Sequence, residues 1–405
     1  MKKNVPKLRF KDENGNVFPE WELKLLSDIL FEHKTRNLGN TFSEVFSVAK
    51  TKGIINQIEH LGRSFAGQDT EIYKVVFPFD IVYTKSPTSD FPFGIIKQNK
   101  LNRSGIVSVL YGVFRPSNQF IGFILDSYFS VWQNTFNCLS PIVQKGAKNT
   151  INIGNDAFLQ GIRINLPSSL PEQKKIADFL SAIDERIEYL TKKKELLEQY
   201  KRGVMQKIFS QKLRFKDESG KPFPKWENIS ARSLFASISN KSHESDLPIL
   251  AATQENGMQY RDQIGVKIIS SDKSISTYKI VEKGDFVISL RSFQGGIEYS
   301  QVTGICSPAY TVLKPLKIIH DHFYRYYFKK DTFITQLNGL IVGIRDGKQI
   351  SYEAFSTLTL PYPSLPEQKK IADFLTAIDD KIEHVTRQLE KTTEYKKGLL
   401  QQMFV

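Results

Sequence analysis

The chain has 405 residues and is 40% hydrophobic, 12% aromatic and 24% charged, a balance that indicates folded domains and excludes a disordered or fibrous chain. The chain is longer than a domain with a single hydrophobic core usually is, so we expect two or more domains. A formal net charge of +13 favours polyanionic partners but does not choose between nucleic acid, a membrane surface and mere solubility.

Cysteine usage and hydropathy narrow the cellular setting. Cys138 and Cys306 are too few for a disulfide framework or a zinc cluster, and they indicate a reducing, intracellular environment. The polar start carries no apolar signal segment, and no run approaches the ~18 apolar residues of a membrane helix. We therefore expect a soluble, cytoplasmic protein with no membrane partner.

An internal repeat organises the chain. The segment Lys7–Glu13 returns 205 residues later as Lys212–Glu218, and Leu170–Leu180 returns unchanged, 195 residues later, as Leu365–Leu375. Between these blocks the match is faint but in order. Self-similarity of this kind predicts two structural units that share a scaffold while their surfaces have diverged.

Taken in chain order, each copy begins with a mixed α/β lobe of many short strands. In the first lobe, apolar and β-branched residues predict strands at Phe46–Ala49 and Gly105–Phe114. In the second lobe we predict a strand at Phe286–Leu290 and a helix over His320–Phe333. The aromatic side chains expected to line that helix are Phe323, Tyr326, Tyr327 and Phe328.

A long amphipathic helix follows each lobe. The start signal Leu-Pro-Glu-Gln places Pro171 and Pro366 in the first helical turn, with acidic residues behind them. About 33 residues follow in each copy, which corresponds to roughly 50 Å of helix.

Apolar residues recur along both helices at 4-3 spacing, which predicts a coiled-coil seam. Lys194 and Lys201 interrupt the seam in the first helix, and Thr392 and Lys396 interrupt it in the second. Two matched seams favour pairing of the helices with each other, and packing of each helix on its own lobe is the alternative. The seam positions are Ile176, Leu180, Ile183, Ile187, Leu190, Ile371, Leu375, Ile378, Ile382 and Val385.

The repeat also has a circular order. The segment that follows the first helix copies the segment that opens the chain, so equivalent halves would bring the chain's end near Lys7. An antiparallel helix pair gives this arrangement a pseudo-two-fold axis.

Motifs for catalysis are lacking in the sequence. No Gly-x-Gly-x-x-Gly follows a predicted strand and no Gly-x-x-x-x-Gly-Lys-[Ser/Thr] occurs, so neither S-adenosylmethionine nor ATP has a recognisable site. His320-Asp321-His322 lacks the second ligand pair of a zinc site. Ser307-Pro308-Ala309-Tyr310 lacks the second proline of the amino-methyltransferase motif, and we expect a structural turn there. The sequence predicts no catalytic residue, no metal and no cofactor in this chain.

These motifs resemble the specificity (S) subunit of type I restriction-modification systems. The duplicated blocks Leu170–Ala177 and Leu365–Ala372 carry the resemblance, together with Lys283–Val287 and Ser307–Val312 of the second lobe. The first lobe departs from the pattern, because Pro78-Phe79 stands where the family has Lys-Gly.

The resemblance implies a mixed α/β fold in which two target recognition domains are separated by two long helices that form an antiparallel coiled coil. Each domain would read one half of a bipartite double-stranded DNA target. The helices would set the spacing and dock two methyltransferase (M) subunits, which restriction (R) subunits then join. Adenine N6 methylation with S-adenosylmethionine, and ATP- and Mg-dependent cleavage, would belong to those partners.

The corresponding boundaries follow the repeat. They are 1–165 for the first recognition domain with its repeat segment 6–22, 166–210 for the central helix, 211–360 for the second recognition domain with its repeat segment 211–227, and 361–405 for the C-terminal helix.

Basic and amide side chains of the lobes are the candidates for DNA contact. Lys and Arg outnumber Asp and Glu by 15 to 10 over residues 23–165 and by 15 to 12 over 228–360, as phosphate binding by both lobes requires. Base reading uses forked donors and amides, whereas Lys148 and Arg345, matched across the repeat, suit backbone positioning. The base-reading candidates are Lys50, Lys52, Arg63, Lys85 and Lys97 in the first lobe and Gln254, Arg261, Arg291 and Gln294 in the second.

Two other functions stay open on the sequence. One is a stand-alone DNA methyltransferase with an unusual active site, which binding of S-adenosylmethionine by the purified chain would reveal. The other is a coiled-coil adaptor without DNA binding, which a lack of salt-sensitive binding to duplex DNA would indicate.

Overall fold

The computed structural model describes residues 6–145, 151–265, 275–341 and 350–404. The chain divides into two compact units, a first unit of residues 1–191 with 387–405 and a second unit of residues 192–386. Both divisions fall inside long helices, so each unit contains parts of two helices that are far apart in the sequence.

The first unit is built around a lobe of short strands and helices. Its elements are β1 (Glu22–Leu25), η1 (Leu26–Asp28), β2 (Leu30–Glu32), η2 (Leu38–Asn40), β3 (Phe46–Ala49), β4 (Gly53–Asn56), α1 (Gln57–Leu61), β5 (Lys74–Val76), β6 (Ile81–Thr84), β7 (Ile95–Gln98), β8 (Gly105–Val107), β9 (Gly112–Pro116), α2 (Gln119–Phe129), α3 (Trp132–Leu139), η3 (Ser140–Ile142), β10 (Gln144–Lys145), β11 (Ile151–Asn152), α4 (Asn155–Gly161) and β12 (Arg163–Leu166).

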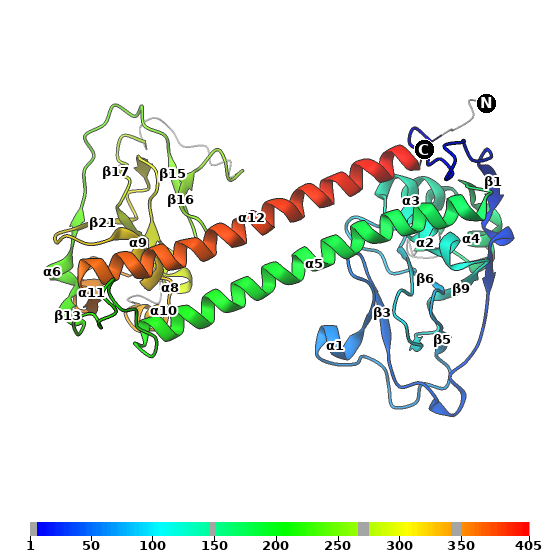
Figure 1. Ribbon diagram of the computed structural model, residues 1–405, viewed down its shortest axis with the longest axis horizontal. Helices are drawn as coiled ribbons and strands as arrows, with labels where there is room; N and C mark the ends of the chain where they lie inside the picture. Colours follow the sequence, from blue (N-terminus) through cyan, green and yellow to red (C-terminus); the bar gives the residue numbers. More distant parts are fainter. Residues whose placement is uncertain (1–5, 146–150, 266–274, 342–349, 405) are drawn as a thin grey trace. The chain divides into compact units, whose positions relative to one another are not determined.

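A four-stranded antiparallel sheet, in the order β2-β9-β6-β7, forms the centre of the first lobe. Its side chains alternate between two faces, as a pleated strand requires. Ile81 and Tyr83 of β6 pack with the helices, while Val82 between them packs under the strand pairs β3–β4 and β5–β8. Figure 1 shows the same layering, with α2, α3 and α4 beside the start of helix α5 and with β3 and β5 on the side away from it.

The second unit repeats this lobe. Its elements are β13 (Glu227–Ser230), α6 (Ala231–Leu234), β14 (Phe235–Ile238), β15 (Leu250–Thr253), β16 (Gly257–Tyr260), β17 (Lys279–Val281), β18 (Phe286–Ile288), α8 (Ser292–Gly295), β19 (Glu298–Tyr299), β20 (Gly304–Cys306), β21 (Thr311–Pro315), α9 (Asp321–Tyr327), α10 (Asp331–Asn338), α11 (Tyr352–Ser356) and β22 (Thr359–Tyr362).

The two lobes share one topology. The sheet order β14-β21-β18-β19 matches β2-β9-β6-β7, and the pairs β15–β16, β17–β20 and β13–β22 match β3–β4, β5–β8 and β1–β12. The predicted strand at Phe46–Ala49 is confirmed, and that at Phe286–Leu290 ends two residues early. The sequence therefore predicted a mixed α/β fold with a repeated lobe correctly.

Two elements that we predicted as continuous are each divided into two in the structure. Residues 105–114 form two strands, β8 and β9, because a turn closed by the Tyr111 amide donating to the Ser108 carbonyl (3.1 Å) separates them. The helix predicted over 320–333 is α9 followed by α10, with a break at residues 328–330. In neither place does a proline mark the change of direction in the sequence.

Helices α5 (Leu170–Phe209) and α12 (Leu365–Met403) have 40 and 39 residues, longer than the predicted 33. At 1.5 Å per residue each is about 60 Å long. Both begin at the predicted Leu-Pro-Glu-Gln signal. Within each unit the start of one helix lies antiparallel to the end of the other, because Asp184 pairs with Lys396 in the first unit and Asp379 with Lys201 in the second.

The predicted seam residues have two roles. Near the helix starts, Ile176 and Leu180 pack into the core of the first lobe, and Ile371, Leu375 and Ile378 pack into that of the second. Leu190 and Val385 farther along are also buried. Each helix therefore packs on its own lobe as well as on the other helix, so both arrangements considered for the seam are present.

The repeated sequence blocks meet in a buried ion pair. Glu172 of α5 is fully buried, and its carboxylate accepts hydrogen bonds from Arg9 Nε (3.1 Å), Arg9 Nη2 (2.9 Å) and Trp21 Nε1 (3.1 Å). In the second unit Arg214 binds the fully buried Glu367 in the same way, at 3.1 and 2.8 Å. The Lys-Leu-Arg-Phe and Leu-Pro-Glu-Gln motifs recur together because their Arg and Glu form one contact.

The circular order predicted from the repeat is confirmed within the first unit. The Lys7 and Leu8 amides donate to the Gln402 carbonyl at 2.9 and 3.3 Å, so the chain's opening segment follows the end of α12. In the second unit the corresponding segment continues directly from the end of α5, and the Leu213 amide donates to the Lys207 carbonyl (3.0 Å). The repeat segment of the first unit is thus joined to the preceding helix end by non-covalent contacts, and that of the second unit by the peptide chain itself.

Candidate nucleic-acid interface

Matched polar residues shape the turns of both lobes. Lys74 Nζ donates to the Tyr111 carbonyl and Lys279 Nζ to the Tyr310 carbonyl, both at 2.6 Å. Burial lowers the pKa of each of these lysines. Their charges therefore hold a turn between two strands and are not presented to a ligand. The predicted structural turn at residues 307–310 is confirmed by the Tyr310 amide, which donates to the Ser307 carbonyl (3.0 Å).

In the first lobe, two connections that carry candidate residues come together. Lys50 and Lys52 lie exposed in the turn between β3 and β4. The Lys50 ammonium pairs with Asp90 and lies 5.8 Å from the centre of the Phe91 ring, which places the loop between β6 and β7 against this turn. The two lysines thus stand on a surface formed from two segments far apart in the sequence.

Arg63 lies exposed in the segment that follows α1 in the same lobe. Its guanidinium carbon is 4.7 Å from the centre of the Phe65 ring, and the Phe65 side chain is itself 61% exposed. A guanidinium stacked on a solvent-facing ring keeps its N–H donors at the edge, where they can bind a phosphate or a base.

In the second lobe the equivalent connections also meet. Gln254 lies exposed in the turn between β15 and β16, and Arg291 and Gln294 lie exposed at α8, which follows β18. A Cβ on Gly295 would stand only 2.6 Å from the Gln254 Cγ, so the two connections approach closely and a larger residue at position 295 would require the Gln254 side chain to move. The structure therefore brings three candidates from the second lobe to one surface. Arg261, at the end of β16, is half-buried.

Lys329, which the sequence did not single out, joins these connections. Its ammonium donates to the carbonyls of Gln254 (3.1 Å) and Gly295 (2.8 Å) and to Glu298 Oε2 (2.7 Å). Burial lowers the pKa of Lys329, while the adjacent Glu298 carboxylate opposes the shift. One lysine fixes both loops that carry Gln254, Arg291 and Gln294. No local motif marks such a residue, because its partners are backbone groups of distant loops.

The structure argues against the prediction that Lys97 contacts DNA. It is 8% exposed, and its ammonium donates to Ser130 Oγ (2.5 Å) and lies 3.4 Å from Asp126 Oδ1. Glu298 holds the same place in the second sheet, opposite Val287 as Lys97 is opposite Val82, and it too is buried and paired. Lys97 is thus an internal ion-pair partner and is not available for contact with DNA.

The remaining DNA-contact candidates are one half-buried lysine and two residues that the structure does not describe. Lys85, at the end of β6, is half-buried, and burial lowers its pKa while Glu32 opposes the shift. Lys148 and Arg345 lie outside the described residues.

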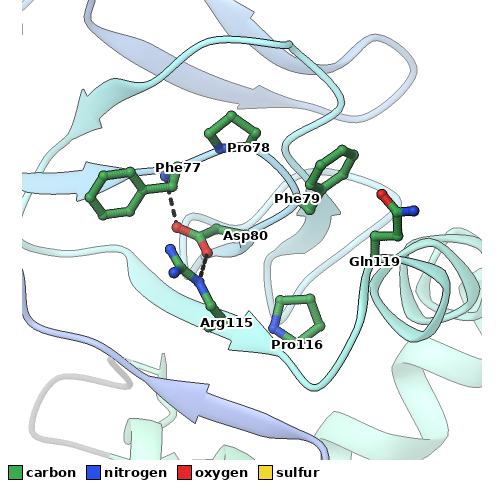
Figure 2. A pocket seen from close by; sticks show the side chains of 7 residues that line it. All are labelled: Phe77, Pro78, Phe79, Asp80, Arg115, Pro116 and Gln119. Atoms are coloured by element: carbon green, nitrogen blue, oxygen red, sulfur yellow. Dashed lines mark hydrogen bonds and ion pairs between the residues drawn. The ribbon is translucent and has the colours of Figure 1, made fainter.

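A pocket of about 320 Å³ lies at the other end of β6, away from the loop that carries Lys85. Figure 2 shows Asp80 at its centre, between the Phe77 backbone and Arg115. Asp80 is fully buried and accepts hydrogen bonds from the Phe77 amide (2.7 Å) and Arg115 Nε (3.0 Å), with His33 Nε2 at 2.8 Å. With its oxygens engaged in this way, the carboxylate stabilises the turn. The residues that line the pocket are Phe77, Pro78, Phe79, Asp80, Arg115, Pro116 and Gln119.

The matched turn of the second lobe is held by a related set of contacts. The Glu282 amide donates to Asp285 Oδ2 (2.8 Å), and Lys314 pairs with Glu282 (2.5 Å). Phe79 has a φ of 69°, in the left-handed region, where the second lobe has Gly284. The departure of the first lobe at Pro78-Phe79 therefore changes the surface of a turn whose backbone is retained.

Within the described part of the chain, no group of three or more His, Cys, Asp or Glu side chains is placed to hold a metal ion. In the same residues no helix combines the length and apolar character that crossing a membrane requires.

The fold places the chain among proteins built from a repeated lobe, each copy of which packs on the start of a long helix and exposes polar turns. Sequence comparison assigns its family. The model of the type I restriction modification DNA specificity domain matches residues 95–199 and 227–394. The match covers more than half of the chain and falls in both copies of the repeat. The chain belongs to this family and is a specificity subunit with two DNA recognition domains.

Individual relatives agree with this assignment. The chain is 24% identical over 420 residues to the protein named as the putative type I restriction enzyme MjaX specificity subunit of Methanocaldococcus jannaschii, covering 96% of this chain and 94% of that protein. The MjaVIII specificity subunit of the same organism is 28% identical over 269 residues, 60% of this chain and 61% of the relative. The crystal structure of the type I S subunit from M. genitalium has the same fold, with a TM-score of 0.61, 15% identity and 99% coverage of both chains.

Proposed function

We propose that this chain reads a bipartite double-stranded DNA target, one half with each lobe. The observation that carries the proposal is the repeated surface on which the connections after the third and sixth strands of each lobe meet and expose basic or amide side chains. In the first lobe that surface holds Lys50 and Lys52, with Arg63 nearby, and in the second it holds Gln254, Arg291 and Gln294. Forked guanidinium groups and amides are the side chains that recognise base edges in the major groove.

The helix pair is proposed to act as a spacer ruler and as the docking site of two methyltransferase (M) subunits, with restriction (R) subunits joining that complex in the cytoplasm. The packing of the helices on the lobes supports this proposal. Each of α5 and α12 packs by its start into one lobe, so the helices are rigidly attached to the parts proposed to read DNA. S-adenosylmethionine, ATP and Mg are proposed to act on the partner subunits, where the methylation and cleavage chemistry would take place.

The function is tested by sequencing the methylome of a strain that expresses this chain with its M subunit. The expected result is one methylated motif of two specified halves separated by unspecified bases. In the Arg291→Ala, Gln294→Ala variant we expect discrimination at the second lobe's half to fall by about 1–3 kcal/mol for each substituted side chain, while the other half is unchanged. Lys225→Ala, which removes an exposed lysine in the repeat segment, is the control and should leave the motif intact.

A motif without two halves would refute the bipartite reading. Loss of both halves together in the Arg291→Ala, Gln294→Ala variant would refute the assignment of these residues to one half-site. No methylation at all, with the M subunit present and active on another specificity subunit, would favour the adaptor without DNA binding.

The ruler role predicts a separate result. Inserting one heptad after Thr191 in α5 and one after Thr386 in α12 preserves the 4-3 seam and adds about 10.5 Å to each helix. Because DNA rises about 3.4 Å and turns about 34° per base pair, we expect the spacer to lengthen by about one to three base pairs with both halves unchanged. The methylome again gives the measurement. An unchanged spacer in a folded double-insertion variant would contradict the ruler.

A further inference from the structure

Two lysines interrupt the apolar helix seam at matched places. Lys201 of α5 and Lys396 of α12 are separated by the same 195 residues as the repeated helix starts. The structure gives each of them an aspartate on the other helix. Lys201 Nζ lies 2.5 Å from Asp379 Oδ1 in the second unit, and Lys396 pairs with Asp184 in the first. A polar residue in an otherwise apolar seam is a known way to specify how helices pair.

Each aspartate is also held by its own lobe, through different chemistry in the two units. In the second unit Tyr326 of α9 donates its hydroxyl to Asp379 Oδ2 at 2.8 Å, and Lys201 Nζ lies 5.1 Å from the centre of the same ring. Tyr326 is 3% exposed, so its hydroxyl has a fixed direction within the lobe. Asp379 therefore joins lobe, α12 and α5 at one point.

In the first unit Lys100 makes the corresponding link. Its ammonium lies 3.4 Å from Asp184 Oδ2 and 2.7 Å from Asp126 Oδ2 of α2. Asp126 is almost fully buried, and although burial alone would raise its pKa, the ammonium groups of Lys100 and Lys97 hold the pKa at about 2. The lobe therefore offers Asp184 a cation that is itself anchored by a buried carboxylate.

Hydrogen bonds and ion pairs are directional, whereas the apolar contacts around them tolerate small rotations. Each lobe also hydrogen-bonds the start of its own helix, through Asn118 to Gln173 and through the His320 amide to Gln368. An aspartate with partners on the lobe and on the other helix would in addition restrict movement of the lobe relative to that second helix. From this geometry we propose that Asp184 and Asp379 are positioning residues, each of which locks its recognition lobe to both helices and so fixes the spacing and rotational phase at which the DNA target is accepted. The inference rests on the proposed function and deepens it.

The test uses the complex of the full chain with its M subunit and duplexes that carry the target with its natural spacer or with one base pair more or fewer. The readout is the ratio of methylation rates between spacers, which does not depend on total activity. In Lys201→Asp, a second carboxylate faces Asp379, and we expect the preference for the natural spacer to fall roughly three- to tenfold, the size of a coupling within one network.

Three matched variants accompany this one. Lys201→Asp, Asp379→Lys restores an opposite pair that the Tyr326 hydroxyl can also contact, so the preference should return. Lys396→Asp should lower the preference less than Lys201→Asp does, because Lys100 still offers Asp184 a cation. Lys369→Asp is the control, since that exposed lysine pairs with Asp373 of its own helix, and the preference should not change.

The outcomes separate this inference from the function on which it rests. If the unaltered complex shows no preference for a spacer, the proposed bipartite reading fails. If the unaltered complex discriminates and Lys201→Asp discriminates equally, or if the reversed pair does not restore the preference, the positioning role is overturned while the function stands. Should Lys201→Asp lower the thermal melting temperature, Lys201→Met, which removes the charge without repulsion, must still reduce the preference for the role to hold.

Discussion

Replacing Arg9 by methionine is expected to lower the free energy of unfolding of the first unit by about 3–5 kcal/mol, the effect of removing one partner of a buried ion pair. Arg9 is 14% exposed and Glu172 fully buried, and two nitrogens of the guanidinium bind the carboxylate. Without Arg9, the Trp21 indole is the one side chain among the described residues that still donates to Glu172. A buried carboxylate with one neutral donor is poorly compensated for the water it has lost.

The measurement is urea unfolding followed by tryptophan fluorescence in a Trp226→Phe background, because the two other tryptophans, Trp21 and Trp132, both lie in the first unit. Lys174→Met is the matched control, since that lysine forms an exposed pair with Asp178 along α5 and should cost no more than about 1 kcal/mol. Arg9→Met, Glu172→Leu should be less destabilised than Arg9→Met alone, because removing both charges leaves no unpaired carboxylate. If Arg9→Met cost no more than Lys174→Met, the ion pair would not be what joins the two repeated motifs.

The frame of the protein was predictable because its determinants are local or repeated. The Leu-Pro-Glu-Gln start, the 4-3 spacing and the two copies of each motif predicted both long helices, their seam and the circular order. The seam's interruptions were visible at Lys201 and Lys396, although the aspartates that bind them could not be known from one helix alone.

The lobes were less predictable, because their strands have two to five residues and their order is set by contacts far apart in the sequence. Nothing in residues 105–114 distinguishes one strand from two strands and a turn, since the turn is held by Lys74 from another strand. Lys97 was chosen for its charge, yet its place opposite Val82 in the sheet puts that charge inside the lobe. Lys329 was missed for the converse reason, because its partners are carbonyl groups of loops whose proximity only the fold creates.

Removing Met403 and the residues after it is expected to unfold the first unit and leave the second folded. Met403 and Phe404 are 0% and 4% exposed, and the Phe404 ring lies 6.3 Å from Trp21 and 5.7 Å from Tyr128. Losing two such side chains costs about 5–10 kcal/mol, which is comparable to the whole stability of a typical domain. Limited proteolysis with mass spectrometry should show new cleavage sites within residues 6–145 and 151–166 and continued protection of residues 227–265 and 275–341. Equal protection of both regions would show that the first unit does not depend on the end of α12.

The same geometry predicts that a circular permutant folds and that its two units exchange their sensitivity to truncation of the chain end. In the second unit Ile208 and Phe209 hold the places of Met403 and Phe404, and only two residues connect Phe209 to the repeated segment at Lys212. A two-residue linker from Phe404 to Lys7, with new chain ends between Ser210 and Gln211, therefore closes the first unit covalently and opens the second. Because closure of a segment by the chain lowers the entropy lost on docking it, truncating the new end at Ile208 should now unfold the second unit and spare the first. If the first unit remained the more sensitive one in the permutant, its dependence on α12 would reflect a weaker core and not the missing peptide connection.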